Sequence, residues 1–207
     1  MTARPRFLLA IVALAVIAGA LGAASAHWLR AAREPKATVL DTPRPLPEFE
    51  LVDHHGRPFE RSDLDGRWSI LFFGFTNCPD VCPVTLQTLA EASDRLDDLP
   101  DARRPRVVFV SVDPARDDAS TLARYVTWFD PRFTGVTGEL ARLQALTDGL
   151  GVAVRYVREP AGVEYTVDHT AAVFLVDPEA RLRAIFTSPH DASQFAQDYR
   201  LITEGRG

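Results

Sequence analysis

The sequence predicts an α/β domain with a mixed central β-sheet, preceded by an N-terminal transmembrane helix. Apolar runs of strand length alternate with segments of helical periodicity between residues 68 and 149. Two further apolar runs joined by a short turn follow them, and a helical segment closes the chain. In this order of elements, the strands form a mixed sheet and the helices pack in layers against it. The connections between parallel strands are expected to be right-handed.

The composition suits one globular domain with an extension. The chain has 207 residues, of which 46% are hydrophobic and 25% charged, and its net charge is −5. A protein that binds nucleic acid usually presents a basic face to phosphates, so the acidic balance argues against that class. We interpret the acidic excess, which is spread along the chain, as a solvated surface.

The N-terminal segment has the features of a membrane anchor. Arg4 and Arg6 precede an apolar stretch over residues 7–26, and about 20 apolar residues can span a bilayer as a helix. The arginines predict a cytoplasmic N-terminus and a soluble domain on the outer, periplasmic or equivalent, face. A cleaved signal peptide is the alternative, because Ala24-Ser25-Ala26 resembles a cleavage site. The predicted parts are a cytoplasmic stub at 1–6, an anchor or signal peptide at 7–29, a linker at 30–45 and the domain at 46–203.

The domain is predicted to begin with a small hairpin and a central strand. Residues 49–52 alternate as a strand does, His54-His55-Gly56 has the residues of a turn, and residues 58–59 return. Residues 68–75 are apolar on both faces and are predicted to form the central strand of the sheet.

A helix is predicted over residues 84–96, where Leu and Ala recur at helical spacing. Proline is tolerated only in the first turn of a helix, so Pro83 is predicted to begin it. Cys82 is then at or beside the N-cap, where the helix dipole favours a thiolate.

The remaining elements are predicted from the same two periodicities, from turn residues and from caps. They are a buried strand at 106–112, a helix at 119–129 with Asp117 or Asp118 as its cap, a short strand at 133–136, a helix at 139–149, a hairpin at 152–157 and 164–167, strands at 171–176 and 182–186, and a helix at 191–202.

Cys78 and Cys82 are the only cysteines, and they lie four residues apart directly after the central strand. This placement suits a disulfide, a reactive dithiol or a pair of thiolate metal ligands. An exported domain is in an oxidising compartment, so the pair tends toward a disulfide unless it is reduced or bound to a metal. A reactive thiol between the first core strand and its helix is typical of a thioredoxin-like fold, which we therefore predict.

His169 precedes the strand at 171–176. In a thioredoxin-like fold, the loop that enters this strand packs against the active-site cysteines. Two thiolates and an imidazole would converge there, a set that suits trigonal Cu(I), whereas a structural zinc site takes a fourth ligand. The simpler interpretation of His169 alone is a hydrogen-bonded turn residue.

Three segments resemble the signature blocks of the Sco/SenC family in their order and approximate spacing. They are Phe73-Gly74-Phe75-Thr76-Asn77-Cys78-Pro79-Asp80-Val81-Cys82-Pro83, Ser111-Val112-Asp113-Pro114-Ala115-Arg116-Asp117, and Asp168-His169-Thr170-Ala171-Ala172-Val173-Phe174-Leu175-Val176-Asp177-Pro178. The resemblance extends over about residues 45–199, and family members share a membrane-anchored N-terminus.

The resemblance implies a thioredoxin-fold copper chaperone. By position, Cys78, Cys82 and His169 would hold one copper ion per chain, as Cu(I) or Cu(II), and the two cysteines could also form a redox-active disulfide. The expected target is the CuA centre in subunit II of cytochrome c oxidase. An upstream copper donor and a thiol reductant are further expected partners.

Three aspartates near these residues have structural and functional interpretations. Asp113 can end a strand and Asp117 can cap a helix, but either could tune the metal site from behind the ligands or contact a partner. Asp80, between the cysteines, could hold the loop by a hydrogen bond or keep the anionic thiolates apart.

Other functions compete with copper delivery. A thiol–disulfide oxidoreductase would use the same dithiol, but those enzymes usually carry C-x-x-C, and residues 161–177 lack the proline that thioredoxins place there. A peroxidase of the peroxiredoxin type would need a threonine where Phe75 and Pro79 stand. A redox or copper sensor could use the same site. We expect a metallochaperone rather than an enzyme, and thiol–disulfide reductase activity stays open.

Overall fold

The computed structural model describes residues 11–22, 34–158 and 165–204, which belong to two units, Met1–Pro35 and Lys36–Gly207. The first unit contributes a helix over residues 11–22. Within these described ranges, no helix is both long and apolar enough to span a bilayer. The predicted stub, both ends of the predicted anchor and the alternative cleavage site lie outside the described residues.

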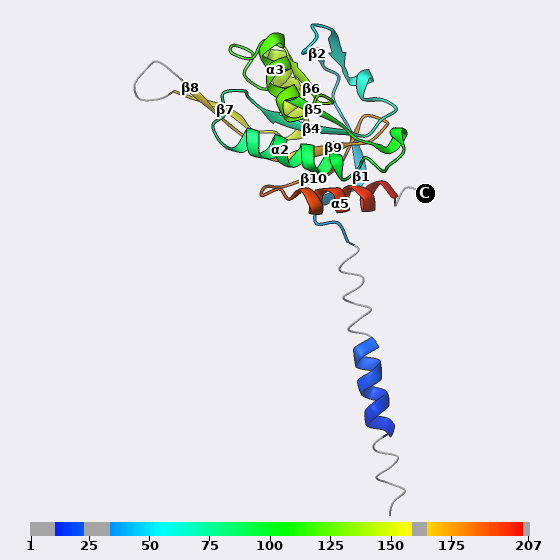
Figure 1. The fold of residues 1–207 in the computed structure, drawn as a ribbon. Coiled ribbons are helices and arrows are strands. Elements are labelled where there is room, and N and C mark those ends of the chain that lie inside the picture. Colours follow the sequence, from blue (N-terminus) through cyan, green and yellow to red (C-terminus); the bar gives the residue numbers. More distant parts are fainter. Residues whose placement is uncertain (1–10, 23–33, 159–164, 205–207) are drawn as a thin grey trace, which may run out of the picture. The chain divides into compact units, whose positions relative to one another are not determined.

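The second unit contains strands and helices in the predicted alternation (Figure 1). Their bounds are β1 Thr38–Pro45, β2 Glu50–Asp53, β3 Pro58–Glu60, β4 Ser69–Gly74, α2 Val81–Asp94, β5 Arg106–Ser111, α3 Ala119–Phe129, β6 Thr134–Thr137, α4 Leu140–Leu150, β7 Val154–Arg158, β8 Tyr165–His169, β9 Val173–Val176, β10 Arg181–Phe186 and α5 Ala192–Glu204, with short 3-10 helices at Arg61–Leu64 and Asp101–Arg103.

An eight-stranded sheet in the order β1-β10-β9-β4-β5-β6-β2-β3 forms the centre of this unit. β4 is parallel to β5 and β5 to β6, whereas β4–β9, β9–β10, β10–β1, β6–β2 and β2–β3 are antiparallel. The predicted mixed sheet is therefore confirmed. The predicted hairpin near residue 160 also forms, as β7 and β8, which pair with each other in a separate two-stranded sheet.

Aromatic residues pack the sheet against its helices. All six residues of β4 are buried, which explains why its sequence is apolar on both faces. Phe72 of β4 is in register with Phe109 of β5, whose ring lies 5.5 Å from that of Tyr125 in α3. On the same face, Phe186 of β10 stacks on Phe195 of α5 at 4.0 Å. Helices α3 and α5 therefore cover the same side of the sheet.

The structure differs from the prediction at the start of the domain. Thr38–Pro45, predicted as part of the linker, forms β1 and pairs with β10. Just before it, the main-chain N–H groups of Lys36 and Ala37 donate to the buried carboxylate of Asp198 in α5, at 3.0 and 2.9 Å. β1 lies at the sheet edge with mostly exposed side chains, so main-chain hydrogen bonds hold it without an apolar pattern in its sequence.

Candidate metal centre

Cys78 and Cys82 lie where β4 leads into α2. This helix begins at Val81, with Asp80 as its N-cap, so Cys82 is its second residue rather than its cap, and the predicted start at Pro83 is two residues late. Pro83 fits the third position, because the first four N–H groups of a helix have no intrahelical partner. Both cysteines are free; Cys82 is fully buried and Cys78 is half-buried.

The structure brings the three predicted ligands together. The sulfur atoms of Cys78 and Cys82 and a ring nitrogen of His169 all lie within 4.8 Å of one another. Cys82 Sγ is 3.4 Å from His169 Nε2, and the Cys82 main-chain N–H donates to Cys78 Sγ at 3.5 Å. Among the described residues, this is the one cluster of His, Cys, Asp or Glu side chains placed to hold a metal ion. Its two sulfurs and one imidazole form a soft donor set.

His169 is the last residue of β8 rather than part of a loop, so the β7–β8 hairpin carries the imidazole to the cysteines. Its Nδ1 lies 3.2 Å from the carbonyl oxygen of Thr170. Because a carbonyl only accepts, Nδ1 would be the donor of this hydrogen bond, and Nε2 is the ring nitrogen that faces Cys82. The edge-to-face ring of Phe75, with a centroid 6.0 Å away, also orients the imidazole.

The two thiols have very different acidities. The pKa of Cys78 is lowered to about 3, first by the hydrogen bond from the Cys82 thiol and then by His169 and by the main-chain N–H groups of Asp80 and Cys82, against the opposing effect of burial. The pKa of Cys82 is raised because its proton is held in the hydrogen bond to Cys78 and because the side chain is buried. The metal-free site therefore pairs an accessible thiolate with a buried thiol.

Gly74, the last residue of β4, makes space for the buried sulfur. A Cβ at this position would lie 2.8 Å from Cys82 Sγ and 2.8 Å from the ring of Phe109. Real Cβ atoms essentially never approach other heavy atoms so closely. A side chain here would displace Cys82 or Phe109, so the glycine is needed for the close approach of α2 to the sheet.

Asp117 fastens the loop that carries Cys78. Its buried carboxylate accepts hydrogen bonds from the main-chain N–H and hydroxyl of Thr76, at 2.9 and 2.6 Å, and from the Ser111 hydroxyl at 2.5 Å. The cap of α3 is instead Asp118, which accepts from the Thr121 N–H at 2.7 Å. Of the two predicted caps, only Asp118 is confirmed, because Asp117 points inward to the cysteine loop.

Asp113 fastens the hairpin that carries His169. Its fully buried carboxylate accepts from the Tyr165 hydroxyl at 2.5 Å and pairs with Arg116. Arg116 also donates to the Tyr165 carbonyl oxygen at 2.9 Å, and its guanidinium lies 4.0 Å from the Tyr165 ring and 5.7 Å from that of Phe75. This network joins the segment after β5 to the beginning of β8, four residues before the imidazole.

Asp80 lies at the surface between the two cysteines, and its side chain makes no capping hydrogen bond. Its main-chain N–H, not its carboxylate, contacts the Cys78 sulfur. Sequence reasoning missed the roles of Gly74 and Arg116. Both lie in segments whose sequence pattern was noted. Only the packing shows that Gly74 leaves room for a sulfur and that Arg116 joins Asp113 to Tyr165.

The fold and site together define a class of protein. A mixed sheet whose first core strand leads to a dithiol at the beginning of a helix is a thioredoxin-like domain, here with an imidazole beside the dithiol. The family model described as SCO1/SenC matches residues 39–204, and the chain belongs to this family. The family resemblance predicted from the three sequence blocks is thereby confirmed.

Similar proteins include mitochondrial and bacterial members of the family. The mouse SCO2 homolog is 34% identical over 153 residues, which cover 74% of this chain and 60% of the mouse protein. A copper-bound ScoI structure from Arabidopsis thaliana is 31% identical, with a TM-score of 0.71, and the match covers 77% of this chain and 98% of that one. Copper-bound ScoI from Bradyrhizobium japonicum is 32% identical with a TM-score of 0.68, over 75% of this chain and 98% of that one.

Proposed function

We propose that the protein is a metallochaperone that carries one copper ion on Cys78, Cys82 and His169. The observation that carries the proposal is the convergence of two sulfurs and one imidazole nitrogen within 4.8 Å. Thiolates select Cu(I), and imidazole suits copper in either oxidation state. Three donors leave one side of the ion open for transfer, whereas a structural zinc site is closed by four. Two similar ScoI structures are described as copper-bound, which supports this choice.

Each ligand has a distinct part in loading and release. The half-buried Cys78 thiolate is the first sulfur that an incoming copper ion meets. The buried Cys82 thiol then loses its proton as its sulfur binds, and His169 Nε2 completes the set. Release follows by exchange of these ligands for those of the acceptor. A disulfide between the cysteines would remove both sulfur donors and prevent loading.

The surrounding aspartates act on the ligands without touching the ion. Asp117 holds the cysteine loop, and Asp113 holds the histidine hairpin through Arg116 and Tyr165. Both carboxylates thus preset the spacing between the thiolates and the imidazole. Asp80 contributes its main-chain N–H to the Cys78 thiolate, while its exposed carboxylate is available to a docking partner.

The destination of the copper is the CuA centre in subunit II of cytochrome c oxidase, as the family resemblance implies. The apolar stretch at residues 7–26 anchors the chain, and the domain lies on the outer face of the membrane, where a CuA site is assembled. An upstream donor supplies the copper, and a thiol reductant keeps the cysteines reduced in this oxidising compartment.

Copper titration of the reduced protein tests the ligand set. We expect one equivalent to bind, with thiolate-to-Cu(II) charge-transfer absorption and a matching EPR signal. Cys78→Ala and Cys82→Ala should each abolish retention. His169→Ala should weaken the binding of Cu(II) more than that of Cu(I), because soft thiolates dominate the Cu(I) site.

His190→Ala is the matched control and should change neither affinity, since the His190 ring is hydrogen-bonded to the Ala171 carbonyl oxygen. Unchanged affinities in His169→Ala would show that the ligand assignment is wrong.

A thiol–disulfide oxidoreductase is a second candidate, favoured by the unequal pKa values of the two cysteines. A low-pKa thiolate beside a protonated partner is the arrangement that attacks a disulfide and then resolves the mixed intermediate. Such a protein would prepare the CuA cysteines rather than load them. Rapid exchange with a model disulfide, together with failure to retain copper, would favour this function. A sensor that uses the same site would instead change a partner's binding when copper or oxidant is added.

A further inference from the structure

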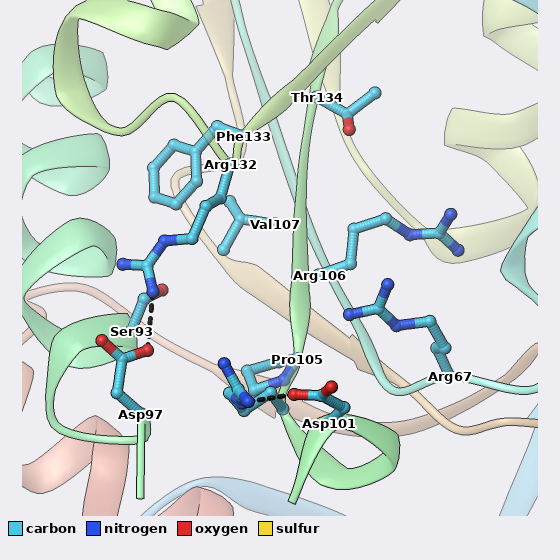
Figure 2. A pocket seen from close by; sticks show the side chains of 11 residues that line it. Arg67, Ser93, Asp97, Asp101, Pro105, Arg106, Val107, Arg132, Phe133 and Thr134 are labelled. Atoms are coloured by element: carbon cyan, nitrogen blue, oxygen red, sulfur yellow. Dashed lines mark hydrogen bonds and ion pairs between the residues drawn. The ribbon is translucent and has the colours of Figure 1, made fainter. Parts of the chain in front are cut away.

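A cavity of about 360 Å³ lies at the end of the sheet remote from the cysteines. β4 and β5 are parallel, and the cysteines follow the carboxyl end of β4, whereas this cavity lies at the amino ends of both strands. The six residues of β4 span about 20 Å between the two places. Four arginines line the cavity, which we call the arginine cavity: Arg67, Arg104, Arg106 and Arg132 (Figure 2).

Two of these arginines are already paired with carboxylates. Arg132 contacts three of them, Asp130 at 2.6 Å, Asp97 at 2.6 Å and Asp94 at 2.8 Å. The pairs with Asp130 and then Asp97 raise its pKa. Arg104 pairs with Asp101 and also donates to the Leu99 carbonyl oxygen at 3.0 Å. These two guanidinium groups therefore have charge partners within the protein.

The other two make no such close pair with a carboxylate of the described residues. In the described part of the chain, no carboxylate oxygen lies within 4.0 Å of Arg67 or Arg106. Arg106 donates to the Asp63 carbonyl oxygen and to the Ser69 hydroxyl at 3.4 Å, while its buried Nε has no hydrogen-bond partner. Burial and the charge of Arg67 lower the pKa of Arg106, against the opposing effect of the Asp63 charge. Figure 2 shows the Arg67 and Arg106 side chains next to each other in the view, extended in opposite directions.

We propose that the arginine cavity binds a small molecule that bears a phosphate group, with Arg67 and Arg106 as the direct contacts of the phosphate oxygens. Planar guanidinium groups match phosphate through paired hydrogen bonds, and an anion between them offsets their repulsion. The cavity volume is in the range of ligand sites, roughly 300–1,000 Å³, and exceeds the needs of bare phosphate. Val107 and Phe133 supply an apolar wall for the remainder of the ligand.

Thermal unfolding and calorimetric titration of the full chain, in a nonionic detergent at low ionic strength, test this site. The probes are inorganic phosphate and glycerol 3-phosphate, with sodium chloride added to equal ionic strength as the reference. Phosphate at ten times its dissociation constant should raise the folded-to-unfolded ratio about 11-fold. Arg67→Gln and Arg106→Gln should each weaken binding at least about tenfold, because each removes charge-assisted hydrogen bonds. Arg124→Gln, which removes an arginine of α3 that lies outside the cavity, should bind as the parent does.

Each outcome decides the proposal. Tighter binding of glycerol 3-phosphate than of phosphate would support a phosphomonoester, such as a lipid headgroup, whereas equal binding would support free phosphate. Stabilisation by chloride equal to that by phosphate would overturn the proposal, and so would equal phosphate affinity in all three variants. Arg67 is exposed, so its variant keeps the test valid if Arg106→Gln fails to fold. Copper binding is measured in parallel, and its failure would bear on the metal centre alone.

Discussion

At the scale of single residues, Gly74 leaves the space that the buried Cys82 sulfur occupies. Gly74→Ala would place a Cβ 2.8 Å from Cys82 Sγ, so we expect a loss of about 1–3 kcal/mol in stability, together with weaker copper binding and altered charge-transfer absorption. Gly135→Ala is the matched control. Its Cβ would press on Leu122 and Val126 of α3 at 3.1 and 3.2 Å, so stability should fall while the copper spectrum stays unchanged. Equal spectra in both variants would contradict the role given to Gly74.

The two cysteines should differ in reactivity. In the reduced, metal-free protein, iodoacetamide should modify Cys78 and spare the fully buried Cys82, and a denaturant should make both reactive. The pKa of Cys78 is lowered to about 3, so its thiolate persists until the pH falls toward that value. Its labelling rate should therefore stay flat between about pH 8 and 5, whereas that of N-acetylcysteine falls about tenfold per unit. Mass spectrometry of the labelled peptides identifies the site, and preferential labelling of Cys82 would refute the assignment.

At the scale of elements, two consecutive aspartates, Asp117 and Asp118, stabilise different parts of the fold. Asp117 fastens the cysteine loop, whereas Asp118 caps α3. Asp117→Asn replaces one accepting oxygen with a donor that faces other donors, so we expect a loss of about 2–3 kcal/mol in stability and a reduced copper affinity. Asp118→Asn makes the same change of charge one residue away, but asparagine is an equally good cap, so stability and copper affinity should both stay near those of the parent. Denaturant titration and copper competition measure the two effects, and equal copper affinities in the two variants would exclude a role of Asp117 in the site.

At the scale of the whole molecule, the unit that contains the sheet begins earlier than its apolar pattern suggests. A chain that starts at Glu34 keeps β1 and the hydrogen bonds from Lys36 and Ala37 to Asp198. A chain that starts at Leu46 loses both, exposes the edge of β10 and leaves part of a buried carboxylate without donors. Each kcal/mol lost should lower Tm by about 2–4 °C, and the open edge should promote self-association. Calorimetry and light scattering compare the two chains, and an equal Tm would show that β1 is dispensable.

The sequence by itself predicted the mixed α/β sheet, the helix after the cysteines and the pairing of the segments around residue 160. These features depend on hydrophobic periodicity and on turn residues, and both can be read from residues that are close together in the sequence. The Cys78–Cys82 pair and His169 were predicted as ligands, because soft donors are few in this chain and their spacing resembles that of a family. The helix start was placed late, since Pro83 also fits the third helical position.

Only the tertiary structure decided what distant parts of the chain do to one another. β1 is held by main-chain hydrogen bonds to a strand and a helix far along the sequence, and such bonds leave no side-chain pattern. Asp117 had the sequence position of a helix cap, but its carboxylate contacts a loop 41 residues away. The space that Gly74 leaves for a sulfur, and the two arginines without carboxylates in the arginine cavity, likewise depend on packing between separate elements, which no local pattern specifies.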